Sequence, residues 1–289
     1  MNSALRISII LPAKNEARGL AEILPRLRKA YQAAEIIVVN DGSTDDTIEV
    51  CASHHVKVIT HPYSMGNGAA IKSGARAAQG DTLVFMDADG QHQPEDIPHL
   101  IETLNESYDM VVGARDAQSQ AGMGRWLINT VYNRLASWMV GQSILDLTSG
   151  FRAVRADKFR KFLYLLPNGF SYPTTITMGF FRAGYAVAYV PIHAPRRIGK
   201  SHIRVVRDGI RFFLIIFKIG TLYSPLKIFL PVSLLFFLLG SGYYTYTFIN
   251  SGRFTNMSAL LLITSILIFL IGLVSEQITS LNYMDSDKD

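Results

Sequence analysis

Apolar runs of strand length alternate with amphipathic stretches of helix length along the first part of the chain. The predicted strands lie at residues 7–11, 35–40, 56–60, 82–87 and 110–113, and the predicted helices at 16–33, 44–54, 66–78 and 94–107. This alternation predicts right-handed crossovers and an α/β fold, a mainly parallel sheet with helices on both faces. Ligands of such sheets bind beyond the carboxyl ends of the strands, so polar residues just after a strand are candidates for function.

Two long segments without charged residues, 228–251 and 254–275, follow later in the chain. Each has about the 20 residues that a helix needs to cross a bilayer. Only Gly252-Arg253 separates them, so we expect a transmembrane hairpin. The alternative, a pair of buried helices in a soluble core, needs more surrounding protein than this chain provides.

The hydropathy pattern divides the chain into four parts. We expect a soluble α/β domain at 1–200, an amphipathic juxtamembrane segment at 201–227, two spans within 228–275 and a short tail at 276–289. In the second part Arg204, Arg207, Arg211 and Lys218 share one helical face, which suits a helix lying in the membrane interface. The alternative is a solvated charged face on a helix of the soluble domain.

Charge and cysteine content refine this picture. The net charge is +5, and the basic excess gathers at 196–227, just before the first apolar segment. A basic patch there favours anionic lipid head groups over nucleic acid. The positive-inside rule then places the soluble domain and both termini in the cytoplasm. The short apolar run at 6–11 does not have the length of a signal peptide, and the single Cys51 suits a reducing compartment.

The strongest candidate for chemistry is Asp87-Ala88-Asp89, directly after a buried strand. Two carboxylates one residue apart suit Mg²⁺ or Mn²⁺ and its phosphate ligands, with Gln91 or His92 as a further ligand. Acidic, small-residue loops also follow the first two predicted strands, at 12–16 and 40–45. Such loops also make ordinary turns and caps, but three of them on one sheet edge indicate a pocket for a nucleotide and its metal.

Several of these stretches resemble the family 2 glycosyltransferases with the GT-A fold, and within them the polyprenyl-phosphate sugar transferases of the dolichyl-phosphate mannose synthase type. The matching stretches are residues 11–16, 39–45, 66–70, 87–91 with 94–96, 113–115 and 146–152. The resemblance implies a Rossmann-like GT-A catalytic domain, followed by the interfacial helix and the hairpin.

The resemblance also implies roles for individual residues. Those expected to line the nucleotide pocket are Pro12, Ala13, Asn15, Glu16, Asp41 and Asp87, with Asp41 reading the base. Those expected to hold Mg²⁺ or Mn²⁺ on the donor diphosphate are Asp89 and Gln91. The expected catalytic set is Asp89, Asp146, Arg115 and Arg152, the two arginines facing phosphate groups. Weaker candidates for the acceptor phosphate are Arg125, Arg134, Arg196 and Lys200.

The implied reaction is transfer of a sugar, with inversion, from a UDP- or GDP-sugar to a polyprenyl phosphate at the cytoplasmic membrane face. The acceptor oxygen is already anionic, so arginines that offset repulsion between two anions matter more than a strong base. The pattern departs from its relatives where Phe170-Ser171-Tyr172 is followed by Pro173 instead of a glutamate. It departs again at His202, where lysine is usual. These departures concern the identity of sugar and acceptor, and the role of His202 stays open.

Two other functions fit parts of the pattern. One is transfer to a saccharide acceptor, as in a processive polysaccharide synthase. Such synthases usually carry a Gln-x-x-Arg-Trp motif and more spans, but Gly122 lies three residues before Arg125-Trp126. A non-catalytic membrane scaffold would not need Asp87-Ala88-Asp89. Two spans bury little surface, so we expect homo-oligomers, membrane lipids as partners, and no nucleic acid.

Overall fold

The computed structural model describes residues 6–115, 123–169, 171–193, 217, 220–221 and 224–284. The chain divides into two compact units, Met1–Val205 and Val206–Asp289. Most of the expected amphipathic segment 201–227 lies outside the described residues, as do Arg196, Lys200 and His202.

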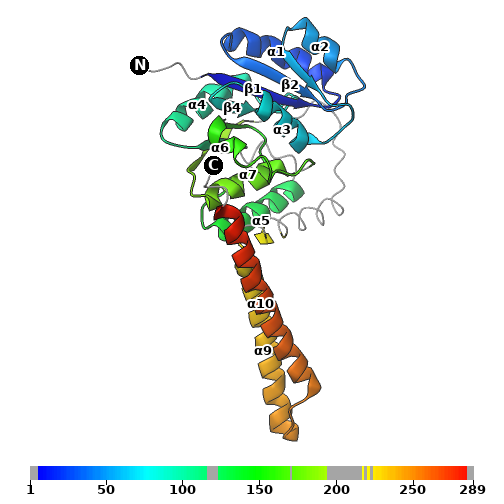
Figure 1. Ribbon diagram of the computed structural model, residues 1–289, viewed down its shortest axis with the longest axis vertical. Helices are drawn as coiled ribbons and strands as arrows, with labels where there is room; N and C mark the ends of the chain where they lie inside the picture. The colour runs from blue at the N-terminus through cyan, green and yellow to red at the C-terminus, as the bar shows by residue number, and fades with distance from the viewer. Residues whose placement is uncertain are drawn as a thin grey trace. The chain divides into compact units, whose positions relative to one another are not determined.

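The first unit is built on a seven-stranded sheet in the order β3-β2-β1-β4-β6-β5-β7 (Figure 1). The strands are β1 (Ile7–Ala13), β2 (Glu35–Asn40), β3 (Lys57–Thr60), β4 (Thr82–Phe85), β5 (Met110–Arg115), β6 (Arg152–Arg155) and β7 (Val187–Ile192). Within the sheet β6 runs antiparallel to both of its neighbours, and the other pairs are parallel. The start of β6 therefore lies at the edge where β4 and β5 end.

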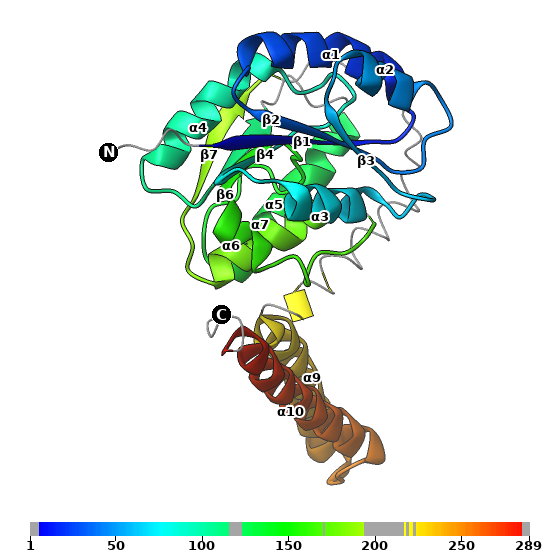
Figure 2. The same cartoon turned by 45° about the horizontal axis from the view of Figure 1, so that its top comes forward.

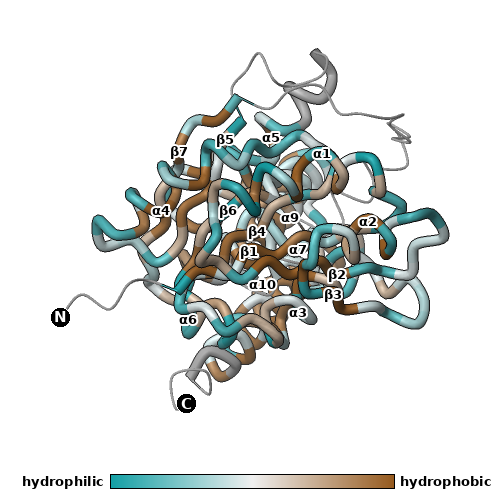
Figure 3. Tube along the Cα trace, turned by 90° about the horizontal axis from the view of Figure 1, so that it is seen from above, coloured by the Kyte–Doolittle hydropathy of each residue, from teal (hydrophilic) through white to brown (hydrophobic). Residues whose placement is uncertain are grey.

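Helices cover both faces of this sheet (Figure 2). The helices are α1 (Ala17–Ala30), α2 (Thr47–Ser53), α3 (Asn67–Ala77), α4 (Ile97–Asn105), α5 (Met123–Val140), α6 (Ala156–Arg160) and α7 (Tyr172–Arg182), with a short 3-10 helix at Pro94–Asp96 before α4. Ile9 and Leu11 pack in one core with α1 and α4, whereas Ile10 packs in the other with α3, α6 and α7. This alternation is the period of two that a strand buried on both faces requires. The apolar stretches along β1 and β4 stand out in Figure 3.

The structure confirms the predicted α/β class and the five predicted strands, with small shifts at their ends. The sequence did not predict β6, β7 or the helices α5 to α7. The reversal at β6 escaped prediction because Arg152-Ala153-Val154-Arg155 is too short to show a clear period. It matters for function, since it brings residues 146–151 to the carboxyl edge of the parallel strands.

The second unit contains the two helices of the predicted hairpin, α9 (Pro225–Ser251) and α10 (Asn256–Met284). Within each helix an 18-residue stretch reaches a mean hydropathy of 1.7 in α9 and 2.7 in α10, and both helices are long and apolar enough to cross a membrane. Gly252 ends α9 in the left-handed region, with φ 61°, and donates its N–H to the Phe248 carbonyl. Each span is longer than the uncharged segment that indicated it.

Small residues hold the two helices together. The hydroxyl of Ser233 donates to the Ser265 carbonyl, and that of Ser265 donates to the Ser233 carbonyl, both at 2.9 Å. A Cβ at Gly272 would lie 2.7 Å from the Cβ of Phe229, so the side chain of Phe229 packs directly on the backbone of α10 there. Small residues and interhelical hydrogen bonds are what hold helices together in lipid, where apolar burial gives no driving force.

Gly272→Ala should therefore weaken the hairpin, whereas Gly242→Ala should not, because a Cβ at Gly242 meets no described atom within 4 Å. Overpacking costs about 1–3 kcal/mol, partly offset by the better helix propensity of alanine, about 1 kcal/mol. Thermal unfolding of the full chain in detergent measures both variants. Equal melting temperatures for the two would contradict the close contact.

Candidate active site

The loops after β1, β2 and β4, the end of β5 at Arg115 and the loop before β6 meet at one edge of the sheet. The parallel registers bring the ends of β1, β2 and β4 together, and Phe85, the last residue of β4, pairs with Arg152, the first of β6. Most of the residues singled out by the sequence lie in these loops or at the strand ends that adjoin them.

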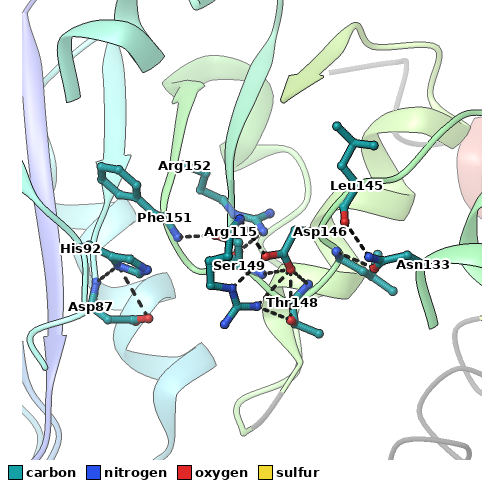
Figure 4. A network of polar contacts seen from close by, with 11 residues as sticks. Asp87, His92, Arg115, Asn133, Leu145, Asp146, Thr148, Ser149, Phe151 and Arg152 are labelled. Atoms are coloured by element: carbon teal, nitrogen blue, oxygen red, sulfur yellow. Dashed lines mark hydrogen bonds and ion pairs between the residues drawn. The ribbon is translucent and has the colours of Figure 1, made fainter. Parts of the chain in front are cut away.

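The acidic turn after β4 is braced by a buried histidine (Figure 4). The backbone N–H of Asp87 donates to Nδ1 of His92 at 2.9 Å, and the His92 ring stacks on Phe151 with centroids 4.9 Å apart. Burial lowers the pKa of His92 to about 4, so the ring is neutral and its Nδ1 accepts. His92 therefore supports the turn, and its Nδ1 is already occupied by the backbone.

The turn itself brings Asp87 and Asp89 to the sheet edge. Asp89 Oδ1 accepts the N–H of Gln91 at 3.1 Å, and Gly90 between them has φ 80°, a conformation that glycine adopts without strain. Asp87 is partly exposed and Asp89 is buried. The backbone thus fixes both carboxylates on one tight turn.

Helix α1 presses directly on this turn. A Cβ at Gly19 would lie 2.0 Å from the carbonyl oxygen of Ala88 and 3.4 Å from Cα of Asp89. Only glycine permits this approach, so the first turns of α1 set the position of the two carboxylates.

The donor set suits a hard divalent cation shared with a ligand. The described residues contain no group of three or more His, Cys, Asp or Glu side chains that could hold a metal by themselves. Mg²⁺ and Mn²⁺ typically take one or two protein carboxylates and complete their shell with substrate phosphates and water. Asp89 with Asp87 and the Gln91 amide fit that pattern, and a closed protein cage is not required.

An ion pair joins the end of β5 to the loop before β6 (Figure 4). Arg115 donates from Nε and Nη2 to the two oxygens of Asp146, at 2.8 and 3.0 Å, and from Nη2 to the Thr148 hydroxyl at 2.6 Å. Burial opposes the charge on both groups, but their mutual hydrogen bonds outweigh it. The pKa of Asp146 is therefore lowered and that of Arg115 raised. A bidentate guanidinium–carboxylate pair of this kind fixes geometry as well as charge.

Asp146 also folds its own loop. Its Oδ1 accepts the backbone N–H groups of Thr148 and Ser149, at 3.0 and 3.1 Å. The loop then passes close to the acidic turn, because a Cβ at Gly150 would lie 2.9 Å from Oδ2 of Asp87. The cationic and the acidic parts of the site are thus in contact through Gly150.

Arg152 lies beneath this loop and is fully buried. Its guanidinium donates to the carbonyl of Ser149, to the Pro173 carbonyl at 3.3 Å and to the Thr177 hydroxyl at 3.2 Å. It also lies over the Tyr172 ring, 5.7 Å from its centroid. The structure places it as a support between the loop and α7, whereas the sequence analysis expected it to face phosphate groups.

The loops after β1 and β2 are joined by hydrogen bonds. Asn15, with φ 56°, donates its N–H to the Ser43 hydroxyl at 2.9 Å and accepts the N–H of Thr44 at 2.8 Å. The N–H of Glu16 donates to the Thr47 hydroxyl at 3.3 Å. Pro12 is partly buried and Ala13 buried at the end of β1. These residues lie together at the ends of β1 and β2, and their lining of a nucleotide pocket stays a prediction.

Asp41 occupies the centre of a second network. Its carboxylate accepts from Nδ1 of His61 and the N–H of Met65, each at 2.7 Å, from the Ser64 hydroxyl at 2.8 Å and from the N–H of Gly66 at 2.9 Å. Burial disfavours its charge, yet the hydrogen bonds, that of His61 foremost, lower the pKa of Asp41. Four donors occupy the four lone-pair positions of a carboxylate. In this arrangement Asp41 holds the loop 61–66, and its reading of a base stays a prediction.

The remaining predicted residues lie elsewhere. Arg134 is on the exposed side of α5, and the side chain of Arg125 is outside the described part of the chain. Residues that the sequence analysis missed are Gly19, His61, Thr148 and Ser149. Of these, Thr148 and Ser149 stood inside a matching stretch, and their hydroxyls next to Asp146 were the available signal.

Two family models match the chain. Residues 8–163 match the model described as glycosyl transferase family 2, and residues 224–281 match the model described as GtrB C-terminal hairpin. Together they cover most of the sheet domain and the hairpin.

Curated relatives carry related names. The undecaprenyl-phosphate mannosyltransferase of Micrococcus luteus is 32% identical over 68% of this chain and 87% of its own length. The dolichol-phosphate mannosyltransferase of Pyrococcus furiosus is 36% identical over 53% of this chain and 47% of its own length.

Solved structures share the fold. Glucosyl-3-phosphoglycerate synthase of Mycobacterium tuberculosis in complex with Mn²⁺ and UDP-glucose has a TM-score of 0.61 at 22% identity, over 74% of this chain and 79% of its own. At this identity the similarity establishes the architecture of the domain.

The contact between α1 and the acidic turn gives a first prediction. Gly19→Ala should displace Ala88 and Asp89 and lower stability by about 1–3 kcal/mol, a usual cost of overpacking. The matched control is Gly169→Ala, since a Cβ there meets no described atom within 4 Å. Denaturant unfolding compares the two variants, and a Gly19→Ala protein as stable as the control would refute the contact.

The ion pair gives a second prediction. Asp146→Asn should lower stability by about 2–3 kcal/mol, the range for a lost hydrogen-bonded charge partner. Because the pKa of Asp146 is lowered, its contribution is complete above the ordinary Asp pKa of about 4 and is lost as pH falls through the lower folded-state pKa.

The difference in melting temperature between wild type and Asp146→Asn should therefore be constant above about pH 5 and shrink under more acidic conditions. A difference that grows on acidification would mean that the carboxylate is not the stabilised form.

Proposed function

Because the chain belongs to glycosyl transferase family 2, and is a glycosyltransferase, we propose that it moves a sugar from a nucleotide-sugar donor to a polyprenyl phosphate in a membrane. The observation that carries this proposal is the contact, through Gly150, between an acidic turn suited to a metal–diphosphate and a loop held by the Arg115–Asp146 pair. The apolar hairpin and the names of the relatives support the lipid acceptor.

The donor diphosphate is assigned to the acidic turn. Asp89, with the Gln91 amide, would hold Mg²⁺ or Mn²⁺, and Asp87 would lie beside the nucleoside. When bound, the metal supplies positive charge that stabilises the departing nucleoside diphosphate. Gly19 and His92 keep the turn in place, so the carboxylates need no rearrangement as that charge develops. The wall formed by Pro12, Ala13, Asn15 and Glu16, with the loop that Asp41 holds, would accept the nucleotide, UDP or GDP.

The acceptor phosphate is assigned to the side of the loop 146–151. Arg115 interacts electrostatically with Asp87 and Asp89 of the acidic turn, and its hydrogen bonds to Asp146 fix the orientation of its guanidinium group. A phosphate monoester is already ionised at neutral pH, so its oxygen can attack the anomeric carbon without a strong base. Direct attack of this kind inverts the configuration, and Arg115 would offset the repulsion between the two anions.

Membrane topology and assembly belong to the same proposal. We place the sheet domain and both termini on the cytoplasmic side, where nucleotide sugars are made, from the distribution of basic residues. Packing of hairpins between chains would give a homo-oligomer, since most of the hairpin surface is not buried within one chain.

The test is transfer of radiolabelled sugar from a panel of UDP- and GDP-sugars to undecaprenyl or dolichyl phosphate, with and without Mg²⁺ or Mn²⁺. Asp89→Asn should lower the lipid-extractable label by about 100-fold or more, as expected when electrostatic stabilisation of the leaving group is lost. The control is Asp81→Asn, which removes an exposed carboxylate paired with Arg6 at the opposite edge of the sheet.

Three results would overturn parts of the proposal. Label found only in soluble saccharide would show that the acceptor is a saccharide and not a polyprenyl phosphate. Equal activity of Asp89→Asn and Asp81→Asn would show that Asp89 of the acidic turn does not hold the metal. Retention of the anomeric configuration in the product would exclude direct attack by the lipid phosphate.

A further inference from the structure

The loop between β3 and α3, residues 61–66, carries an exposed aromatic ring at the edge of the sheet where the candidate active site lies. Tyr63 is 67% exposed, more than any other aromatic residue that the structure describes in the sheet domain. The loop follows β3, which is parallel to β2, so it lies at the same edge as the loops after β1 and β2. Most of this tyrosine is therefore open to a ligand bound at that edge.

Although the ring is exposed, Asp41 holds the backbone of the loop. Its carboxylate accepts from the Ser64 hydroxyl at 2.8 Å and from the backbone N–H groups of the two following residues, at 2.7 and 2.9 Å. Nδ1 of His61, at the start of the loop, donates to the same carboxylate at 2.7 Å. The loop is thus fixed on both sides of Tyr63.

The loops after β1 and β2 also press on this segment. A Cβ at Gly42 would lie 2.8 Å from the backbone nitrogen of Ser64 and 2.9 Å from the carbonyl carbon of Tyr63. Gly42 has φ 68°, a conformation that glycine adopts without strain. Lys14 donates from Nζ to the Ser64 hydroxyl at 2.9 Å. The peptide that carries Tyr63 is therefore held from two neighbouring strands.

An exposed ring on a fixed backbone suits the binding of a flat ligand. A tyrosine side chain has two χ angles, so it loses little conformational entropy when a ligand covers it. A backbone that is already held adds no further cost of ordering. Every nucleobase has a π-face that can stack on such a ring. Tyr63 is thus suited to hold a base by its face rather than by its hydrogen-bonding edge.

The strand order places Tyr63 at the nucleoside end of the proposed donor site. The acidic turn follows β4, and β1, β2 and β3 come next in that order. Adjacent strands lie about 4.8 Å apart, so the loop after β3 is about 14 Å along the edge from the acidic turn. A nucleoside that extends from a diphosphate at the turn, across the loops after β1 and β2, brings its base toward residues 61–66.

The two loops in between offer no alternative ring. Residues 12–16 and 40–45 contain no aromatic side chain. Asp41, the carboxylate expected to read the base, already accepts four hydrogen bonds from the loop 61–66, which is the number that its lone pairs allow. Tyr63 is therefore the side chain of these three loops that is best placed to stack on a base.

We infer that Tyr63 is the platform on which the nucleobase of the sugar donor stacks, and that Asp41, Gly42 and Lys14 are positioning residues that fix its backbone. The inference rests on the proposed function, because it takes the acidic turn as the site of the donor diphosphate. Stacking uses the face of the base and not its edge, so UDP and GDP would both gain affinity from Tyr63.

The test measures the binding of UDP and of GDP, each with Mn²⁺, to the full chain in detergent by isothermal titration calorimetry. Tyr63→Ala should weaken the binding of the nucleotide that wild type binds by about 5- to 150-fold, which corresponds to about 1–3 kcal/mol for one base stacked on an aromatic ring. Tyr63→Phe keeps the ring and should bind as wild type does.

Ribose 5-diphosphate, which has no base, separates stacking from other effects of the substitution. With Mn²⁺ it should bind equally to wild type and to Tyr63→Ala, because its diphosphate contacts the acidic turn. The control variant is Tyr164→Ala, which removes a 64% exposed ring in the segment after α6 and should change neither affinity. The melting temperature of each variant shows that it is folded.

The outcomes distinguish a wrong platform from a wrong function. Equal affinity of wild type and Tyr63→Ala for the nucleotide would overturn the inference and leave the proposed donor site intact. An equal loss of affinity for the nucleotide and for ribose 5-diphosphate would also overturn it, because Tyr63 would then act on the loop and not on the base. A wild-type chain that binds neither UDP nor GDP with Mn²⁺ would refute the proposed function, and this inference with it.

Discussion

The antiparallel insertion of β6 between β4 and β5 is the constraint on which the site depends. It turns the loop 146–151 toward the edge where the parallel strands end, and there the Arg115–Asp146 pair fastens it to β5. Without that reversal the loop 146–151 would enter β6 at the opposite edge of the sheet, away from both the acidic turn and Arg115. One change of strand direction thus brings residues more than fifty positions apart into a single site.

Close contacts at glycines fix the positions of the acidic turn and the loop 146–151 more precisely than charge attraction alone would. Gly19 lets α1 touch the turn that carries Asp89, and Gly150 lets the cationic loop touch Asp87. In both places a single methyl group would separate the parts. A close contact at a glycine also occurs in the hairpin. Apolar burial does not drive helix association in lipid, and there Gly272 and the hydrogen-bonded Ser233 and Ser265 hold α9 and α10 together.

Much of this could be predicted from sequence, for identifiable reasons. The runs that became β1, β2 and β4 contain consecutive apolar residues, and the acidic turn follows β4 directly, so the sequence indicated both the strands and the edge of the site. Arg152 was misleading because a four-residue strand does not reveal which face a side chain takes, and it points inward. The hydrogen-bond donors to Asp41 lie at residues 61–66, and no local sequence pattern predicts that they would donate to its carboxylate.

The central proposal is that the sheet edge binds a metal–diphosphate through Asp89. The most direct measurement is a structure of the full chain with Mn²⁺ and the nucleoside diphosphate that it binds, with the metal located by anomalous scattering. We expect one anomalous peak for manganese between the Asp89 carboxylate and the diphosphate, with Arg115 still paired to Asp146. A nucleotide bound away from the acidic turn, or a metal that does not touch Asp89, would contradict it.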